Sequence, residues 1–310
     1  MQFLFAPVQG HTDAAYRHFH SKIYGGGLTY YSPFLRLEKN ELRPRDVKDL
    51  TSYLNSNHHL IPQIIFRDKE ELLRLTDILI KLGAKEIDLN MGCPFPLQTG
   101  HKRGAATIAN EALGIQVKNL VNSTPEVNFS VKIRLGLNNK DDWHILLPIL
   151  NETTLTHITL HPRIARQQYG GAPDLVEFGK FLSESTNPVI YNGDLKTPED
   201  IFDVQKKFPG IHGVMIGRGL LGRPTLFNEF QYGKDMEPKE RLTLMLKFHN
   251  ELFRHYSEVL CGKTQIISKI QPFWEYAGEE IGRKAWKTIK KASNLAKYQS
   301  AIAMIQNSII

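Results

Sequence analysis

The chain has 310 residues, of which 41% are hydrophobic and 23% charged. This balance supports a buried core and excludes a disordered, collagen-like or low-complexity chain. The formal net charge of +7 is compatible with a polyanionic partner without identifying one. The sequence contains two cysteines, Cys93 and Cys261, far apart. A disulfide scaffold is therefore excluded, and a reducing compartment is expected.

The first residues and the hydropathy of the chain predict a protein without a leader or a membrane span. Residues 1–7 carry no basic segment, and their apolar run is too short for a signal peptide. No stretch approaches the ~18 apolar residues that a membrane helix needs. We therefore expect a soluble, cytoplasmic protein.

Eight short apolar runs rich in β-branched residues predict eight strands. Most are almost continuously apolar, as expected for parallel strands that helices cover on the outside. The runs are residues 3–8, 28–33, 60–66, 86–92, 129–136, 157–161, 188–193 and 213–219.

The segments between these runs have helical spacing. Residues 68–82 place Leu72, Leu75 and Leu79 on one face, and Thr197-Pro198 is typical of a capped helix start. Eight successive β/α units predict an α/β fold, a (β/α)8 TIM barrel. An open doubly wound sheet is the alternative. The other expected helices are residues 111–121, 141–150, 174–182, 223–230 and a segment after residue 44.

The strand pattern stops after residue 233. Residues 240–260, 264–276 and 282–305 have apolar positions at helical spacing, which predicts a barrel domain at 1–234 and a small all-helical domain at 235–310. One helical face there carries Arg283, Lys287, Lys290 and Lys291. A solvated face is one interpretation. The concentration of basic residues in the appended domain favours a surface for a phosphate backbone.

Polar residues end most of the predicted strands. In a TIM barrel these ends meet at one face and build the active site. Burying such groups without partners costs about 1–3 kcal/mol each, so a converging set predicts a site rather than core. Read in order, the strand ends are Ala6-Pro7, which is apolar, and then Gln63, Asn90 to Cys93, Lys132 with Arg134, His161 with Arg163, Asn192-Gly193-Asp194 and Gly217-Arg218.

The last two strand ends indicate a phosphate site. Residues 217–222 match G-x-G-x-x-G, but helical sequence follows, so we reject a Rossmann interpretation. Loops after strands seven and eight of TIM barrels commonly hold a phosphate. Arg218 would add a charged contact. A phosphate-bearing cofactor or substrate is therefore predicted.

Lys132 and Cys93 are candidates for the chemistry. Lys132 could form a Schiff base, as in an aldolase, or serve as a fixed cation beside a flavin. Cys93 at a strand end next to Pro94 predicts a thiol that faces the barrel mouth, as a general acid or a nucleophile. The alternative is a small buried apolar thiol. The loop that follows contributes His101, Lys102 and Arg103.

Several stretches together resemble the flavin-dependent tRNA-dihydrouridine synthases. They span nearly the whole predicted barrel in order. The matching residues are Ala6-Pro7 with Thr12-Asp13, the segment 88–94 with its Asn-Met-Gly-Cys-Pro motif, 131–136, His161-Pro162-Arg163 with Tyr169 and Gly171, 188–194 and 213–219.

The resemblance implies FMN across the barrel mouth, NADPH as the reductant and tRNA as the partner. Hydride would pass from flavin N5 to C6 of a uridine, with the D-loop of the tRNA as the expected location, and Cys93 would protonate C5. It implies no metal, and we expect a monomer. It implies phosphate ligands at Asn192, Gly193, Asp194, Gly217 and Arg218, ring contacts from Gln63, Lys132, His161 and Ala6-Pro7, and substrate or tRNA contacts from Asn90, Arg134, Arg163, His101, Lys102, Arg103, Arg283, Lys287, Lys290 and Lys291.

Three segments depart from the usual family pattern: Phe95-Pro96-Leu97, Pro162 and Gln9-Gly10-His11. None removes an implied cofactor ligand. Two other classes remain open. One is a small-molecule barrel enzyme, either a dihydroorotate-type flavin dehydrogenase or a Lys132 Schiff-base aldolase. The other is a tRNA-binding protein without catalysis.

Overall fold

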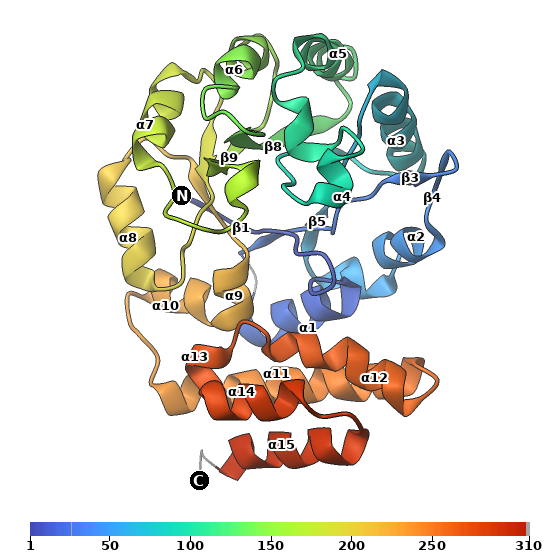
Figure 1. Cartoon of the computed structure of the whole chain (residues 1–310), viewed down its shortest axis with the longest axis vertical. Coiled ribbons are helices and arrows are strands. Elements are labelled where there is room, and N and C mark those ends of the chain that lie inside the picture. The colour runs from blue at the N-terminus through green and yellow to red at the C-terminus, as the bar shows by residue number, and fades with distance from the viewer. Residues whose placement is uncertain (26, 308–310) are drawn as a thin grey trace.

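Parallel strands form a closed barrel in the computed structural model, which describes residues 1–25 and 27–307 (Figure 1). The sheet order is β5-β2-β1-β11-β10-β9-β8-β7-β6. The strands are β1 (Gln2–Phe5), β2 (Thr29–Tyr31), β5 (His59–Ile61), β6 (Gln63–Ile64), β7 (Glu86–Met91), β8 (Asn128–Gly136), β9 (Ile158–Ile164), β10 (Val189–Tyr191) and β11 (Gly213–Ile216).

The two ends of this sheet are halves of one strand. β5 pairs with β2 and β6 pairs with β7, and Pro62 alone separates β5 from β6. Proline has no backbone N–H to donate, so it interrupts the ladder. Its carbonyl still accepts a hydrogen bond from the Asp88 N–H at 2.9 Å. Counted this way the barrel has eight strands, so the predicted (β/α)8 fold is confirmed.

Helices cover the barrel on its outside (Figure 1). In α3 the Asp68 side chain caps the first turn by accepting from the Glu71 N–H, and Leu72, Leu75 and Leu79 are fully buried. The layer comprises α1 (Ala14–Tyr24), α2 (Pro44–Leu50), α3 (Lys69–Lys81), α5 (Glu111–Asn122), α6 (Trp143–Asn151), α7 (Leu175–Glu184), α8 (Pro198–Lys207) and α10 (Leu226–Tyr232).

Short elements decorate the loops of the barrel. A small antiparallel hairpin, β3 (Leu37–Glu38) with β4 (Glu41–Leu42), lies outside the barrel sheet. At the end that carries the site, α4 (Pro96–Thr99) follows β7, and α9 (Arg218–Gly222) follows β11. The sequence pattern did not predict the hairpin or α4.

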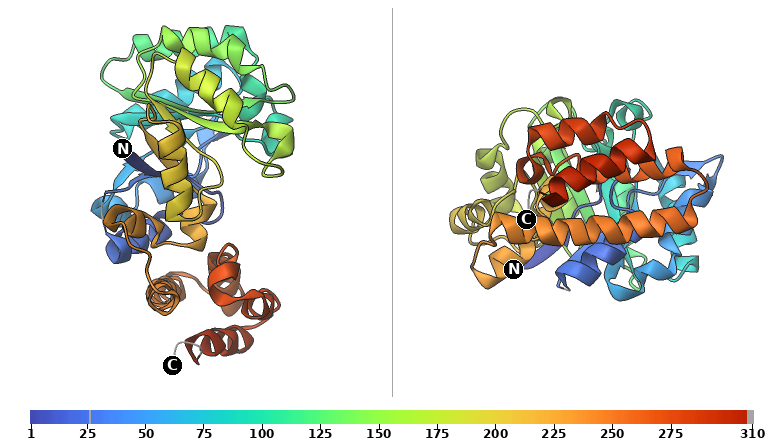
Figure 2. Two further views of the ribbon diagram at one scale, coloured as in Figure 1. Left: turned by 90° about the vertical axis from the view of Figure 1, so that its left-hand side faces the viewer. Right: turned by 90° about the horizontal axis from the view of Figure 1, so that it is seen from below.

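The C-terminal helices form a separate layer against one side of the barrel (Figure 2). They are α11 (Pro238–Val259), α12 (Lys263–Ile270), α13 (Gly278–Ile281), α14 (Arg283–Lys290) and α15 (Leu295–Asn307). We call α11 to α15 the helical layer. Two of the three predicted helices are broken: a 3-10 helix, Gln271–Trp274, follows α12, and residues 291–294 separate α14 from α15.

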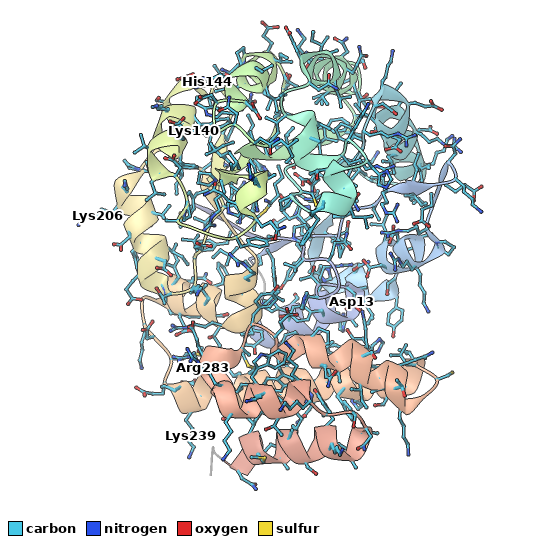
Figure 3. All side chains as sticks on the ribbon, viewed as in Figure 1. Asp13, Lys140, His144, Lys206, Lys239 and Arg283 are labelled. Atoms are coloured by element: carbon cyan, nitrogen blue, oxygen red, sulfur yellow. The ribbon has the colours of Figure 1, made fainter. Side chains whose placement is uncertain are left out.

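The helical layer shares its core with the barrel. The rings of Phe248 from α11 and Tyr16 from α1 meet edge to face at 4.8 Å, and both side chains are buried. A polar contact lies beside them. Asp13 caps α1 by accepting from the Tyr16 N–H, and it also accepts from the Tyr256 hydroxyl of α11 at 3.0 Å. Figure 3 shows Asp13 where the barrel meets the helical layer.

Among the described residues, no helix combines the length and the apolar character needed to cross a bilayer.

Candidate active site

A cavity of about 290 Å³ opens at the carboxyl ends of the barrel strands. Its lining includes all ten residues expected to hold the cofactor, together with Cys93, Asn90 and Arg134. The ten are Ala6, Pro7, Gln63, Lys132, His161, Asn192, Gly193, Asp194, Gly217 and Arg218. Strands β1, β6, β7, β8, β9, β10 and β11 all contribute to this lining directly or through the residues that follow them.

A continuous hydrogen-bond chain runs along one wall of the cavity. Asp88 on β7 is fully buried; it accepts from the Ser130 hydroxyl at 2.6 Å and from the Gln63 amide nitrogen at 2.6 Å. The Gln63 amide oxygen accepts from the Asn90 side chain at 2.7 Å. The Asn90 side-chain oxygen accepts from the Cys93 N–H at 2.9 Å. Burial raises the pKa of Asp88 to about 6, so the carboxyl is mostly ionised at neutral pH.

Lys132 is a cation enclosed by protein at the centre of the site. It lines the cavity, and its Nζ donates to the Asn192 side-chain oxygen at 2.9 Å. The Asn192 amide nitrogen in turn donates to the Met215 carbonyl at 2.6 Å, which fixes the orientation of that amide. Desolvation by burial and the nearby Arg134 charge lower the pKa of Lys132 to about 8. The amine is therefore mostly protonated at pH 7.

His161 is a neutral donor beside a buried arginine. Arg163 donates to His161 Nε2 at 3.0 Å, so the remaining ring proton is on Nδ1. Burial, with the charges of Arg134 and Lys132, holds the pKa of His161 well below its usual range. Arg163 is 1% exposed and also binds Asp194 and the Gly171 carbonyl. It lies behind the cavity lining rather than in it.

Two arginines balance the charge of Asp194. Arg163 forms an ion pair with it, and Arg218 donates to it at 2.8 Å. The guanidinium of Arg218 also lies 3.9 Å from the centroid of the Tyr169 ring, a cation–π distance. Asp194 has φ of 45° in the left-handed region, so the loop after β10 turns sharply here. Residues 192–194 and 217–218 therefore form one polar corner of the cavity.

Cys93 lies in the cavity lining although it is 6% exposed. The loop after it folds back closely, because the Ala105 N–H donates to the Cys93 carbonyl at 3.1 Å and Gly104, with φ of 59°, leaves no room for a side chain against Cys93. Burial raises the pKa of the Cys93 thiol, despite opposing effects from Arg134 and Lys132. The thiol is therefore protonated at neutral pH, as a proton donor must be.

The basic residues of the loop after Cys93 lie outside the cavity lining. Arg103 was expected to contact tRNA, but it is 5% exposed and forms a buried ion pair with Glu71 of α3. The structure thus gives Arg103 a partner in the barrel instead of a surface position. His101 and Lys102 are exposed.

The basic face of the helical layer is solvent-accessible. Arg283, Lys287, Lys290 and Lys291 are all exposed on or directly after α14. Between α14 and α15 lies a groove of about 550 Å³, whose lining includes Lys284, Lys287, Lys291 and several small residues.

Several cavity residues were not assigned by sequence reasoning. Tyr276 comes from the helical layer and lines the cavity together with His11, which follows β1. The two rings lie 5.3 Å apart, and His11 contacts Glu275 at 3.3 Å. Phe34 and Phe95 add further aromatic lining. No local pattern could have found Tyr276, because its place depends on how the helical layer packs on the barrel.

One group of side chains could approach a metal ion. The ligand atoms of Asp141, His144 and Glu177 lie within 4.8 Å of one another on the outside of the barrel. Glu177 already binds Lys180 at 2.9 Å and Lys140 at 3.3 Å. Figure 3 shows Lys140 and His144 far from the helical layer.

The sequence model of the family described as "Dihydrouridine synthase (Dus)" matches residues 4–305. The chain belongs to the dihydrouridine synthase family. The family expected from the sequence motifs is thereby confirmed, and the chain is an enzyme of that oxidoreductase family.

Relatives with curated names agree with this membership. A protein of Staphylococcus aureus named "Probable tRNA-dihydrouridine synthase" is 28% identical over 268 residues, covering 83% of this chain and 78% of that protein. "Probable tRNA-dihydrouridine synthase 2" of Bacillus subtilis is 27% identical over 264 residues, with coverage of 83% and 79%. Among solved structures, morphinone reductase matches with a TM-score of 0.56 at 9% identity, covering 76% of this chain and 87% of that one. This last likeness shows the barrel fold.

Proposed function

We propose that this enzyme reduces a uridine of tRNA to dihydrouridine with FMN held in the barrel cavity. The observation that carries the proposal is the convergence of a protonated thiol, Cys93, and a cation, Lys132, on one cavity at the strand ends. Family membership and the printed names of the relatives support uridine in tRNA as the substrate.

The residues of the cavity fit FMN by the chemistry of their donors. Arg218 and the backbone of Gly193 and Gly217 surround the polar corner, where a phosphate would find a cation and N–H groups. Asp194 does not oppose an anion there, because Arg163 and Arg218 already balance its charge. Gln63, Lys132 and His161 would face the ring system, and Ala6-Pro7 would border its edge.

Bound reduced FMN would supply hydride to C6 of the uracil. The protein groups then have separate tasks. Cys93, kept protonated by burial, donates a proton to C5. Lys132 lines the cavity and would stabilise negative charge that develops on a bound ring. Asn90 and Arg134 line the same cavity and would orient the uracil.

The basic face of α14 would bind the phosphates of the tRNA. Extruding a base from its stack costs a few kcal/mol, and contacts with the phosphate backbone can offset that cost. His101 and Lys102 are exposed and would add contacts beside the mouth. NADPH as the reductant, a D-loop target and a monomeric enzyme without a metal stay predictions from the resemblance.

The competing functions predict different results. A Lys132 Schiff-base aldolase would be trapped by borohydride with an aldehyde and would not need flavin. A dihydroorotate-type enzyme would act on a free pyrimidine and would not need the basic helical layer. A tRNA-binding protein without catalysis would bind tRNA and leave uridine unchanged.

The test is nucleoside mapping of tRNA from a strain that lacks this gene, complemented with the wild-type gene or with Cys93→Ala. Cys261→Ala is the matched control, because Cys261 is exposed in the helical layer outside the cavity lining. We expect yellow purified protein, restoration of dihydrouridine by wild type and Cys261→Ala, and no restoration by Cys93→Ala. Colourless protein, or tRNA without restored dihydrouridine, would contradict the proposal.

A further inference from the structure

In the hydrogen-bond chain along the cavity wall, each group donates to the next one toward Asp88. At one end the N–H groups of Gly92 and Cys93 both point to the Asn90 side-chain oxygen, at 3.1 and 2.9 Å. At the other end lies the carboxylate of Asp88, which is fully buried. Backbone N–H groups can donate only, and an ionised carboxylate can accept only.

These two ends determine how both intervening amides are oriented. Asn90 must turn its oxygen to the backbone, so its nitrogen donates to the Gln63 oxygen at 2.7 Å. Gln63 must then turn its nitrogen to Asp88, which accepts at 2.6 Å. Flipping either amide would place two donors or two acceptors against each other, a mismatch that costs about 1–3 kcal/mol for each buried group left without a partner.

The orientation of each amide determines whether it presents a hydrogen-bond donor or an acceptor to a ligand. Each side-chain amide nitrogen carries two protons, and the chain uses one of them at each residue. Gln63 and Asn90 both line the cavity. Each therefore keeps an N–H for a ligand acceptor, such as a carbonyl oxygen or an unprotonated ring nitrogen.

Asp88 itself is outside the cavity lining and cannot touch the ligand from where it lies. We infer that Asp88 is a positioning residue whose charge orients the Gln63 and Asn90 amides as donors to the flavin and the pyrimidine and holds the backbone at Cys93. The inference rests on the proposed function for the identity of the ligands. The charged and titratable neighbours of Asp88 are Lys132 on β8 and Tyr31 on β2. The Ser130 hydroxyl donates a hydrogen bond to the other carboxylate oxygen of Asp88.

The first variant is Asp88→Asn, which keeps the shape but removes the charge and replaces one of the two acceptor oxygens with a donor. We expect the FMN dissociation constant, measured by fluorescence released on dilution of the holoenzyme, to rise at least about tenfold, which is about 1.4 kcal/mol. We also expect kcat for tRNA at saturating FMN to fall, with a shifted flavin absorption spectrum. Glu177→Gln is the control for loss of a buried acid, because Glu177 is 1% exposed and lies outside the cavity lining.

The second variant, Asp88→Asn with Gln63→Glu, moves the carboxylate from position 88 to position 63, the next member of the hydrogen-bond chain. Glu at 63 would accept from both neighbours, so Asn90 would keep its orientation and its contact with the Cys93 N–H. The donor at position 63 would be lost. We therefore expect kcat to recover toward the wild-type value at saturating FMN, while the FMN dissociation constant stays raised.

The outcomes separate this inference from the proposed function. Wild-type protein without bound flavin would contradict the proposed function. Flavin-loaded wild type with an Asp88→Asn variant of unchanged affinity, kcat and spectrum would overturn the inference alone. A double variant whose kcat is no higher than that of Asp88→Asn would also overturn the inference. Restoring an acceptor at position 63 would then not restore activity, so Asp88 would not act by orienting the amides. Should Asp88→Asn fail to fold, the double variant decides: a folded, active protein supports the inference, and an unfolded one contradicts it.

Discussion

The Nζ atom of Lys269 lies 2.6 Å from Oδ2 of Asp13, so α12 of the helical layer forms an ion pair with the residue that caps α1 of the barrel. Tyr256 of α11 donates to the same carboxylate at 3.0 Å. Three elements thus meet at one side chain. A hydrogen bond to a charged group contributes more than a neutral one, about 1.5–3 kcal/mol.

We therefore expect Tyr256→Phe to lower the free energy of unfolding by about 1–2 kcal/mol, because Lys269 remains as a partner of Asp13. Thermal and urea unfolding measure the change. Tyr232→Phe is the control, because Tyr232 is 74% exposed. Equal stability of the two variants would show that this hydrogen bond does not hold the layers together.

The acid form of Cys93 predicts how activity depends on pH. Because burial raises the pKa of this thiol, its protonated fraction stays near one through neutral pH and declines only in the alkaline range above the usual thiol pKa. We measure single-turnover rates of the reduced enzyme with tRNA. Between about pH 6 and 8 we expect no fall in rate that is caused by deprotonation of Cys93. A rate that falls by half near pH 7, and does so less in Cys93→Ser, would contradict this protonation state.

Lys132→Met tests the cation in the cavity. The substitution retains much of the volume and removes the charge, so we expect the FMN dissociation constant to rise about tenfold, or about 1.4 kcal/mol. In wild type the amine loses its proton as pH rises through about 8, so FMN affinity should weaken over that range. The variant should lack this pH dependence. The same pH curve in both proteins would remove Lys132 from the flavin site.

Arg103→Ala distinguishes a structural role from tRNA contact. Removing the arginine leaves Glu71 buried without its main partner, which costs about 3–5 kcal/mol. We expect a lower melting temperature and unchanged tRNA affinity per folded molecule. Lys102→Ala, at an exposed neighbour, should leave stability unchanged and weaken tRNA binding modestly. The reverse pattern would restore Arg103 as a tRNA contact.

The basic face of α14 should determine the salt dependence of tRNA binding. For Lys287→Ala with Lys291→Ala we expect weaker binding and a log–log salt slope that is shallower by about 1 for each phosphate that the variant no longer neutralises. Lys206→Ala is the control, because Lys206 lies on α8, away from α14 (Figure 3). An unchanged slope in the double variant would place the tRNA elsewhere.

The barrel was predictable from sequence because each strand carries its own signal. Nearly continuous apolar runs, capped helix starts such as Asp68 and Thr197, and polar residues at strand ends are all local patterns. The break at Pro62 was readable in principle, because proline cannot donate to the ladder. The position of Cys93 in the cavity lining follows from its place at the end of β7.

Other features depend on contacts between distant segments. Arg103 and Glu71 pair across 32 positions, so a cationic loop in sequence does not reveal a buried ion pair in the fold. The role of Asp88 was hidden for the same reason, since its partners Ser130 and Gln63 come from two other strands. A sequence pattern indicates which positions carry charged side chains. It does not indicate which distant residue pairs with each of them in the fold.

Tyr276 connects the helical layer with the cavity. Its ring belongs to the helical layer but forms part of the cavity wall, next to His11. The shape of the cavity therefore depends on how the helical layer packs against the barrel. The basic face proposed to bind tRNA and this part of the cavity wall thus belong to the same group of helices.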